Sequence, residues 1–304
     1  MAVKKSTSTK RFLSWYWVKV FFFVIFCIHA GFFFAFLFQQ MNSSGFPVQN
    51  LGWKLLAVFV VVFILLFIYI TSFRRIPFVK RIAVFTRELF FIAYISSLLY
   101  LLALRFINPP ITITQLANVA RGYGLHKDNI SAAAMGSNIK LAVISAEDQL
   151  FPDHDGFDVK AIKKAMVYNE KHPQKQRGAS TISQQTAKNV FLWQGGGFLR
   201  KGFEVFFTYS IEKLWNKKII LARYLNVAEM GPGIFGVEAA AKKYFNKNAA
   251  ALTRLEAAQI IACLPNPKKY TVQPLSRYVS VRAQRIAAQM NHLAGDEDIQ
   301  AIIR

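Results

Sequence analysis

Acidic residues and cysteines are scarce in this sequence. It contains 16 Asp and Glu against 38 Lys and Arg, a formal net charge of +22. No RNA- or DNA-binding motif accompanies the cations, so we exclude nucleic acid as a partner and expect anionic lipid head groups or a lipid-linked phosphate. The two cysteines, Cys27 and Cys263, lie in separate apolar segments. We therefore interpret them as small apolar residues rather than as a disulfide pair.

Apolar residues, in contrast, are abundant and concentrated near the N-terminus. Three runs, at 20–38, 55–73 and 89–107, are each long enough to cross a hydrocarbon core of roughly 30 Å as a helix. The first two carry almost no polar stripe, unlike a surface helix of a soluble protein. The third contains Arg105 near its end, where a long cationic side chain can reach the interface. The sequence therefore predicts a membrane region over 1–107 with about three transmembrane helices.

The cations that flank these runs predict the orientation. Five lysines and arginines precede the first run and five lie between the second and third, whereas only Lys54 lies between the first and second. Because cations favour the cytoplasmic side, the N-terminus and the second connection are expected there. Three spans then place residues 108–304 outside the cytoplasm.

Residues 108–304 form the second predicted domain, after the stiff break Asn108-Pro109-Pro110. No segment alternates with period two for long, so we expect an all-α, or mainly helical, domain. Asp158 and Ser180 are the expected N-caps of two of its helices. The expected helices cover 139–149, 158–169, 180–193, 200–215, 217–230, 237–245, 253–264 and a last segment after Pro274.

The stretch AEDQLFPDHDGFD, at 146–158, gathers carboxylates in an otherwise basic chain. Glu147 and Asp148 fall in the last turn of an expected helix, where the helix dipole and a second acid raise a carboxyl pKa. A raised pKa suits a general base or acid near neutrality. Two alternatives are a solvated acidic helix end and a hard-metal site. The metal site would use four side chains: Asp153, His154, Asp155 and Asp158.

The next two expected helices carry polar groups at helical spacing. Thr181, Gln184, Gln185 and Lys188 stand at i, i+3, i+4 and i+7, a stripe of neutral hydrogen-bonding groups suited to a sugar or phosphate groove. The alternative is an ordinary solvent face. Similarly, the i, i+4 pair of Arg200 and Glu204 is either a surface ion pair or part of a site. Between these helices, VFLWQGGGFL at 190–199 is expected to be a mobile hydrophobic loop.

Five motifs, taken in order and spacing, resemble those of the monofunctional peptidoglycan transglycosylases of glycosyltransferase family 51. EDQLFPDHDGFD at 147–158 is similar to the first motif and GASTISQQTAKN at 178–189 to the second. RKGFE at 200–204 is similar to the third. The segments that begin at Lys217 and Glu256 resemble the fourth and fifth. The resemblance covers nearly all of residues 105–285.

The resemblance implies a lysozyme-like, two-lobed, mainly helical domain that polymerises lipid II into β-1,4 glycan and releases undecaprenyl pyrophosphate. It assigns Glu147 as the general base and Glu204 as the second essential carboxylate. Lys188, Arg200 and Lys201 would hold the pyrophosphate. The substrate-binding residues implied in all are Asp148, Ser180, Thr181, Gln184, Gln185, Lys188, Asn189, Arg200, Lys201 and Asn226.

The resemblance also implies partners and a location. The partners would be lipid II, the growing lipid-linked glycan strand, membrane lipids and other cell-wall synthesis or division proteins. The location would be the bacterial inner (cytoplasmic) membrane, multi-pass, with the catalytic domain on the periplasmic or extracellular side. The sequence itself requires no cofactor and predicts no protein-held metal site. Mg²⁺ or Mn²⁺ bound with the donor pyrophosphate is a further expectation.

Two features depart from the pattern of the family. Gly196 stands where relatives commonly carry an arginine that contacts the donor phosphate, and monofunctional relatives usually have one span rather than three. The first departure supports an alternative function, a non-catalytic membrane scaffold of the cell-wall machinery. A lytic, lysozyme-like enzyme is the other alternative.

Overall fold

The computed structural model describes residues 3–43, 60–61, 64, 68 and 75–304. The chain divides into two compact units, Met1–Tyr100 and Leu101–Arg304. The second unit begins before the predicted domain boundary at 107/108, because Leu101 and Leu104 are fully buried in it.

The described part of the first unit contains two long apolar helices, α1 (Val3–Ser43) and all but the last three residues of α3 (Pro77–Ala103). Segments Trp17–Gln39 and Pro77–Ala103 have mean hydropathies of 2.6 and 1.6, and each is only 6% buried. Exposed apolar helices of this length favour a membrane location over a soluble core. The expected helix at 20–38 is therefore confirmed, and the chain is associated with the membrane through apolar helices.

The other two expected spans have different outcomes. The run at 55–73 lies almost wholly outside the described residues, so the count of three spans stays a prediction. The run at 89–107 was misplaced, since the helix begins at Pro77 and ends at Ala103. The charges between 80 and 88 do not interrupt it, because Glu88 accepts hydrogen bonds from Lys19 (2.7 Å) and Arg87 (2.8 Å).

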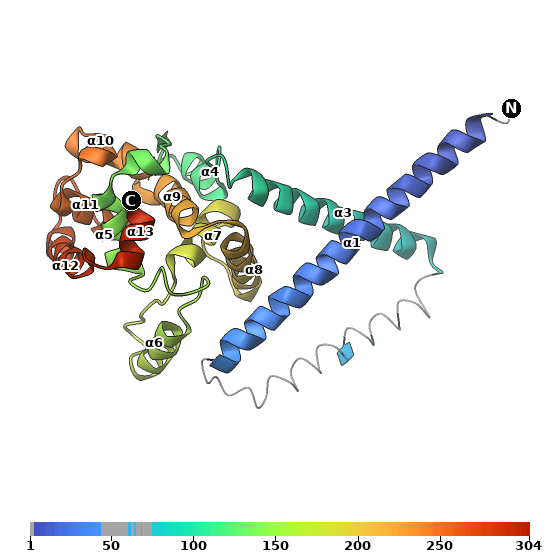
Figure 1. Cartoon of the computed structure of the whole chain (residues 1–304), viewed down its shortest axis with the longest axis horizontal. Coiled ribbons are helices and arrows are strands. Elements are labelled where there is room, and N and C mark those ends of the chain that lie inside the picture. Colours follow the sequence, from blue (N-terminus) through green and yellow to red (C-terminus); the bar gives the residue numbers. More distant parts are fainter. Residues whose placement is uncertain (1–2, 44–59, 62–63, 65–67, 69–74) are drawn as a thin grey trace. The chain divides into compact units, whose positions relative to one another are not determined.

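The second unit is mainly helical (Figure 1). Its first five helices are α4 (Ile113–Ala120), α5 (Ser137–Glu147), α6 (Val159–Lys171), α7 (Ile182–Phe191) and α8 (Phe198–Leu214). The remaining ones are α9 (Lys217–Val227), α10 (Val237–Phe245), α11 (Arg254–Ala262), α12 (Arg277–Leu293) and α13 (Glu297–Ile303). Two short 3₁₀ turns lie at Ala132–Met135 and Ala249–Ala251.

The core of this unit forms around α5. Its apolar residues Ile139, Val143 and Ile144 are fully buried, and α11 and α12 pack against it. A second group is formed by α7 packed against α8 and α9. The C-terminal end of α5 and the buried face of α7 are thereby held by the most heavily packed helices of the domain. This position fixes the side chains that both helices present at their ends.

A small sheet interrupts the all-α expectation. Strands β1 (His126–Lys127), β2 (Glu229–Gly231) and β3 (Ile234–Phe235) pair in the order β1-β3-β2. β1 runs parallel to β3, and β2 runs antiparallel to it. Gly233, with φ 68°, makes the turn between β2 and β3, and a Cβ there would lie 2.1 Å from the Tyr123 carbonyl oxygen. The helix expected through Met230 therefore ends at Val227.

Capping explains most of the helix starts. Asp158 caps α6 as predicted, since its Oδ1 accepts a hydrogen bond from the Ala161 N–H at 2.8 Å. The start of α7 differs, because Thr181 rather than Ser180 is its N-cap. Thr181 and Gln184 form a capping box in which each side chain accepts a hydrogen bond from the other's backbone N–H.

Candidate active site

Glu147 is the last residue of α5 and faces two other helices. Its Oε2 accepts a hydrogen bond from Gln185 Nε2 of α7 at 2.9 Å, and its Oε1 accepts one from Arg282 Nη2 of α12 at 3.1 Å. The carboxylate side chain is 16% exposed and Arg282 is 30% exposed. The Glu147 carboxylate is therefore oriented by one neutral donor and one cation, and it remains accessible to solvent.

The pKa of Glu147 is raised from its ordinary value. Burial is the largest cause, because it disfavours the charged form, and the charge of neighbouring Asp148 adds to it. The hydrogen bond from Gln185 and the charge and hydrogen bond of Arg282 act in the opposite direction. The direction predicted from the helix end is confirmed, although burial rather than the adjacent acid is the main cause.

Gln185 is itself oriented by Tyr224 of α9. The Tyr224 hydroxyl donates a hydrogen bond to Gln185 Oε1 at 3.1 Å, which leaves the amide nitrogen to point at Glu147. Burial raises the pKa of Tyr224 well above its ordinary value, so the hydroxyl keeps the proton that it donates. Tyr224 thus orients Gln185, and Gln185 in turn orients the Glu147 carboxylate.

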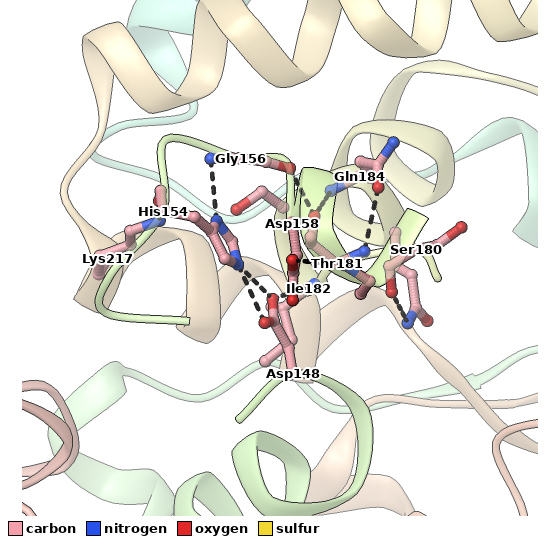
Figure 2. Close-up of polar contacts among 12 residues, drawn as sticks. Asp148, His154, Gly156, Asp158, Ser180, Thr181, Ile182, Gln184 and Lys217 are labelled. Carbon is pink, nitrogen blue, oxygen red and sulfur yellow. Dashed lines mark hydrogen bonds and ion pairs between the residues drawn. The ribbon is translucent and has the colours of Figure 1, made fainter. Parts of the chain in front are cut away.

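The Asp148 side chain points toward His154 and Ile182, as Figure 2 shows. Its Oδ1 lies 2.9 Å from His154 Nε2, and its Oδ2 accepts a hydrogen bond from the Ile182 N–H at 2.9 Å. His154 Nδ1 accepts from the Gly156 N–H, so Nε2 carries the proton donated to Asp148. The buried Asp148 carboxylate therefore ties the start of α7 to the end of α5, a positioning role. Asp148 also lines the same cavity as Glu147, and its expected substrate contact stays a prediction.

The polar stripe of α7 divides into two parts. Thr181 and Gln184 are buried and occupied by the capping box, and Thr181 also donates from its Oγ1 to the Gly156 carbonyl oxygen at 2.6 Å (Figure 2). Gln185 and Lys188 line one cavity, and Thr181 also lines a second one together with Glu147. The sequence pattern did not distinguish these two environments, because a capping box and a groove both use Thr and Gln. Ser180, which precedes the helix, is exposed.

Cations from α7 and α8 gather around Glu204. This carboxylate is 4% exposed and accepts hydrogen bonds from Arg200 Nη1 at 2.6 Å and from Lys201 Nζ. Lys188 of α7 is close enough to interact with Glu204, Arg200 and Lys201 electrostatically. Burial is the main cause that lowers its pKa, the two cations lower it further, and Glu204 opposes them. The pair at 200 and 204 is thus a partly buried site element rather than a surface ion pair.

One cavity is lined by Glu147, and a second is lined by its hydrogen-bond partner Gln185. The larger, of about 410 Å³, is lined by residues of α4, α7 and α9 and by the loop 264–268, and it includes Gln185, Lys188 and Asn189. The smaller, of about 320 Å³, is lined by Glu147, Ser180 and the start of α6. The hydrogen bond between Gln185 and Glu147 joins the walls of the two cavities. A substrate that occupies both would pass the carboxylate.

Several residues of this site were not predicted from the sequence. Arg282 and Tyr224 contact the Glu147–Gln185 pair, although both lie in segments that read as ordinary apolar or basic helices. The larger cavity also contains Asn118, Glu229 and Lys268. Glu229 Oε2 accepts from Asn118 Nδ2 at 3.4 Å, and Glu229 Oε1 lies 3.7 Å from Lys268 Nζ. Burial raises the pKa of Glu229 from its ordinary value.

Asn226 and Gly196 also differ from what the sequence led us to expect. Asn226 is fully buried, and its side chain bonds the Ile130 backbone N–H and carbonyl at 3.0 Å each. It holds the scaffold rather than a substrate. Gly196 has φ 96°, and a Cβ there would lie 3.0 Å from Trp193 Nε1 and 3.3 Å from Arg200 Cβ. An arginine at this position would require the loop to change conformation.

The carboxylates of the site do not fit a protein-held divalent cation. Across the described part of the chain, no group of three His, Cys, Asp or Glu side chains is placed to hold a metal ion. Within the site, the Glu204 carboxylate accepts hydrogen bonds from Arg200 and Lys201. Of the four side chains at 153–158 that were considered as a metal site, two have other partners. His154 bonds Asp148, and Asp158 caps α6.

Comparison with known proteins agrees with this geometry. The sequence profile of the family described as Transglycosylase matches residues 114–291. The biosynthetic peptidoglycan transglycosylase of Salmonella agona (strain SL483) is 54% identical over 175 residues, which cover 58% of this chain and 72% of the relative. The protein of the same description from Escherichia coli O157:H7 (strain EC4115 / EHEC) is 52% identical over 178 residues, 59% of this chain and 74% of the relative. This chain therefore belongs to the transglycosylase family, among whose members are these biosynthetic peptidoglycan transglycosylases.

Proposed function

We propose that this chain polymerises the disaccharide units of lipid II into a β-1,4 glycan strand for cell-wall synthesis and releases undecaprenyl pyrophosphate. The relatives' description and the family match support the reaction class. The observation that carries the proposal is Glu147, a desolvated carboxylate that lines one cavity, bonds Gln185 of a second and interacts electrostatically with Lys188. The family match and the relatives give no support to the scaffold alternative, which rests on Gly196 alone.

Glu147 acts as the general base in this proposal. It takes the proton of the acceptor's 4-hydroxyl, and the acceptor oxygen forms a bond to C1 of the donor sugar. The bond between C1 and the pyrophosphate oxygen breaks, and its electron pair leaves with undecaprenyl pyrophosphate. Attack opposite the leaving group inverts C1. A carboxylate whose pKa is raised by burial is a stronger base than an ordinary one, and the charge and hydrogen bond of Arg282 oppose this rise by favouring the ionised form.

Lys188, Arg200 and Lys201 stabilise the charge that develops on the leaving pyrophosphate. Preorganised cations of this kind act where charge appears in the transition state. Glu204 holds Arg200 and Lys201 in place and offsets the repulsion among the three cations. A divalent cation such as Mg²⁺ or Mn²⁺ would arrive bound to the pyrophosphate, since the described residues include no group of three His, Cys, Asp or Glu side chains placed to hold it. Ser180, Gln185 and Asn189 would contact the sugars.

The wider setting follows from the same proposal. The domain would be lysozyme-like, with its groove between two lobes, and would lie on the periplasmic or extracellular side of the bacterial inner membrane. Its partners would be lipid II, the growing strand and other cell-wall synthesis or division proteins. A phosphatase reporter that is active only outside the cytoplasm tests the topology. The three-span arrangement predicts activity after Pro110 and none after Arg75, so activity at both junctions would contradict it.

The direct experiment is polymerisation of lipid II by the purified full chain and by Glu147→Gln. Loss of the base predicts a decrease in rate of about 10²–10⁴-fold. Glu297→Gln is the matched control, since it makes the same change at an exposed residue of α13. Normal polymerisation by Glu147→Gln would contradict the assignment of the base. Release of muropeptides from finished peptidoglycan, without any polymerisation, would instead favour the lytic alternative.

A further inference from the structure

Arg223 of α9 is a buried cation that the proposed reaction does not use. Its side chain belongs to a residue that is only 8% exposed, and burial alone lowers the pKa of its guanidinium from the ordinary value. Among the described residues, no carboxylate opposes that shift. A buried charge without an ionic partner is costly, so it is retained where its hydrogen bonds hold something specific. The groups that Arg223 contacts show what it holds.

Arg223 binds the chain where it leaves the apolar helix α3. Its Nε donates to the Leu104 carbonyl oxygen at 2.7 Å, and its Nη2 donates to the Arg105 carbonyl oxygen at 3.2 Å. Its Nη1 donates to Asn108 Oδ1 at 2.6 Å. Carbonyl groups at the C-terminal end of a helix lack partners within the helix and favour a cation beside them. The catalytic domain therefore supplies the cap for the end of α3.

The next residue of α9, Tyr224, reaches the proposed base. Its hydroxyl donates to Gln185 Oε1 at 3.1 Å, and Gln185 Nε2 donates to Glu147 Oε2 at 2.9 Å. Adjacent residues of a helix point about 100° apart, so Arg223 and Tyr224 contact different parts of the domain from one turn of α9. Residues 220–227 of this helix are all buried. Because a closely packed helix moves as a unit, a displacement at Arg223 also displaces Tyr224.

The contact between Tyr224 and Gln185 is the sensitive step. At 3.1 Å it is longer than the usual O–H···O distance of about 2.5–3.0 Å, so a small displacement of α9 breaks it. The Gln185 amide then loses the partner that orients it. Its hydrogen bond to Glu147, which lowers the pKa of that carboxyl, becomes weaker.

Arg223 does not act on Glu147 directly. The charged and titratable side chains that interact with this carboxyl are Arg282 of α12, Asp148, Lys188 of α7 and Tyr224. Any effect of Arg223 on Glu147 must therefore pass through the position of α9. A direct charge effect would persist after removal of Gln185, whereas an effect carried by α9 would not.

We propose that Arg223 is a positioning residue that couples the end of helix α3 to Glu147 through Tyr224 and Gln185. These three residues, Arg223, Tyr224 and Gln185, are called the α9 relay. When segment 104–108 is seated against Arg223, α9 keeps Gln185 on the Glu147 carboxylate. Displacement of that segment releases Gln185 and makes the base harder to ionise. The inference rests on the proposed role of Glu147, and it gives the apolar helix a part in setting the pH range of the reaction.

The first measurement follows the ionisation of Glu147 without substrate. The carboxyl bands of the full chain in detergent micelles are titrated by difference infrared spectroscopy, and Glu147→Gln identifies the band of this residue. Arg223→Gln is expected to move the Glu147 titration to higher pH, because Gln185 no longer stabilises the charged form. Arg254→Gln is the matched control, since this exposed arginine also donates to an asparagine, Asn291 Oδ1, at 2.5 Å. The control leaves the titration unchanged.

A double-mutant cycle in the same titration tests the route. Gln185→Leu removes the hydrogen bond to Glu147, so adding Arg223→Gln to it gives no further shift. Asn108→Ala, which removes an acceptor of Arg223 beyond the end of α3, shifts the titration in the same direction and is not additive with Arg223→Gln. An equal shift by Arg223→Gln with and without Gln185 would overturn the relay.

The conservative variant Arg223→Lys separates positioning from stability. It keeps a cation that can reach the carbonyl groups, so it restores most of the wild-type titration. Arg223→Gln that lowers the midpoint of denaturant unfolding but leaves the Glu147 titration unchanged would show a purely structural role and contradict the proposal. If Arg223→Gln does not fold, Arg223→Lys and Asn108→Ala provide the same comparison with the wild type.

Polymerisation of lipid II provides the second readout. At pH values below the acid limb, Arg223→Gln is expected to lower kcat by about two- to tenfold, a factor that corresponds to one neutral hydrogen bond. KM stays unchanged, and the rates converge at high pH. A wild type that does not polymerise lipid II would refute the proposed function and leave the infrared comparison intact. Identical Glu147 titrations in the wild type and Arg223→Gln would refute the relay even where polymerisation is normal.

Discussion

The hydrogen bond from Arg282 to Glu147 predicts a defined change in the pH dependence of the reaction. Arg282→Gln removes a guanidinium that lies 3.1 Å from Glu147 Oε1 and whose charge lowers the pKa of this carboxyl. A hydrogen bond to a charged group contributes about 1.5–3 kcal/mol. The Glu147 side chain remains 16% exposed, so water replaces part of the lost stabilisation. We therefore expect the ionised form of Glu147 to be destabilised by about 1–2 kcal/mol in Arg282→Gln.

The sign of the effect follows from the role of Glu147. A general base must be ionised, so activity falls as pH decreases through its pKa. Without Arg282 the pKa of Glu147 rises further, and the acid limb of the pH–rate profile moves to higher pH. Below that limb the rate falls by about tenfold relative to the wild type, since about 1.4 kcal/mol is a factor of ten. Well above it the two rates converge.

The assay is the initial rate of lipid II polymerisation across the pH range, with two controls. Arg285→Gln makes the same substitution on an exposed arginine of α12 and leaves the profile unchanged. Arg282→Lys keeps a cation at this position, so its acid limb moves less from the wild-type position than that of Arg282→Gln. A rate that falls equally at every pH would indicate a purely structural role for Arg282. An acid limb that does not move would refute the coupling to Glu147.

Three other predictions concern the surroundings of the base. Asp148→Ala leaves the His154 Nε2–H and the Ile182 N–H without their buried acceptor, so the free energy of unfolding falls by about 2–4 kcal/mol in denaturant melts; an unchanged midpoint would contradict its positioning role. Glu204→Gln removes the charge that raises the pKa of Lys188, so the alkaline limb of the pH–rate profile moves to lower pH. An alkaline limb that does not move would contradict the electrostatic coupling of Glu204 to Lys188. Gly196→Arg places a side chain at φ 96°, costs about 1–2 kcal/mol and lowers Tm by a few degrees, whereas an unchanged Tm would show that the loop adapts freely.

The parts of the fold that were predictable depend on local signals. Val237–Phe245 was bounded correctly, and Asp158 was identified as an N-cap, because a cap and an apolar period lie within a few neighbouring residues. Glu147 was singled out by its place at a helix end and by the resemblance of its motif, and its role as the base stays a prediction. The direction of its pKa shift followed from the same position.

The parts that were missed depend on contacts between distant segments. Arg282 approaches Glu147 from 135 residues away, and its own segment gave no sign of that contact. The sequence did not show that Thr181 and Gln184 form the capping box at the start of α7, although Thr181 also lines the cavity beside Glu147. The three short strands have too few residues to show alternation. Their pairing depends on the turn at Gly233 and its close approach to Tyr123.

The most direct test of the central claim is the single-turnover rate of lipid II polymerisation by the wild type and by Glu147→Gln, measured from acid to alkaline pH with lipid II binding followed in parallel. The wild type should lose activity as pH falls through the raised pKa of Glu147. The variant should bind lipid II normally, react at least about a hundredfold more slowly and show no such acid limb. A variant that keeps the wild-type acid limb and rate would show that another group is the base.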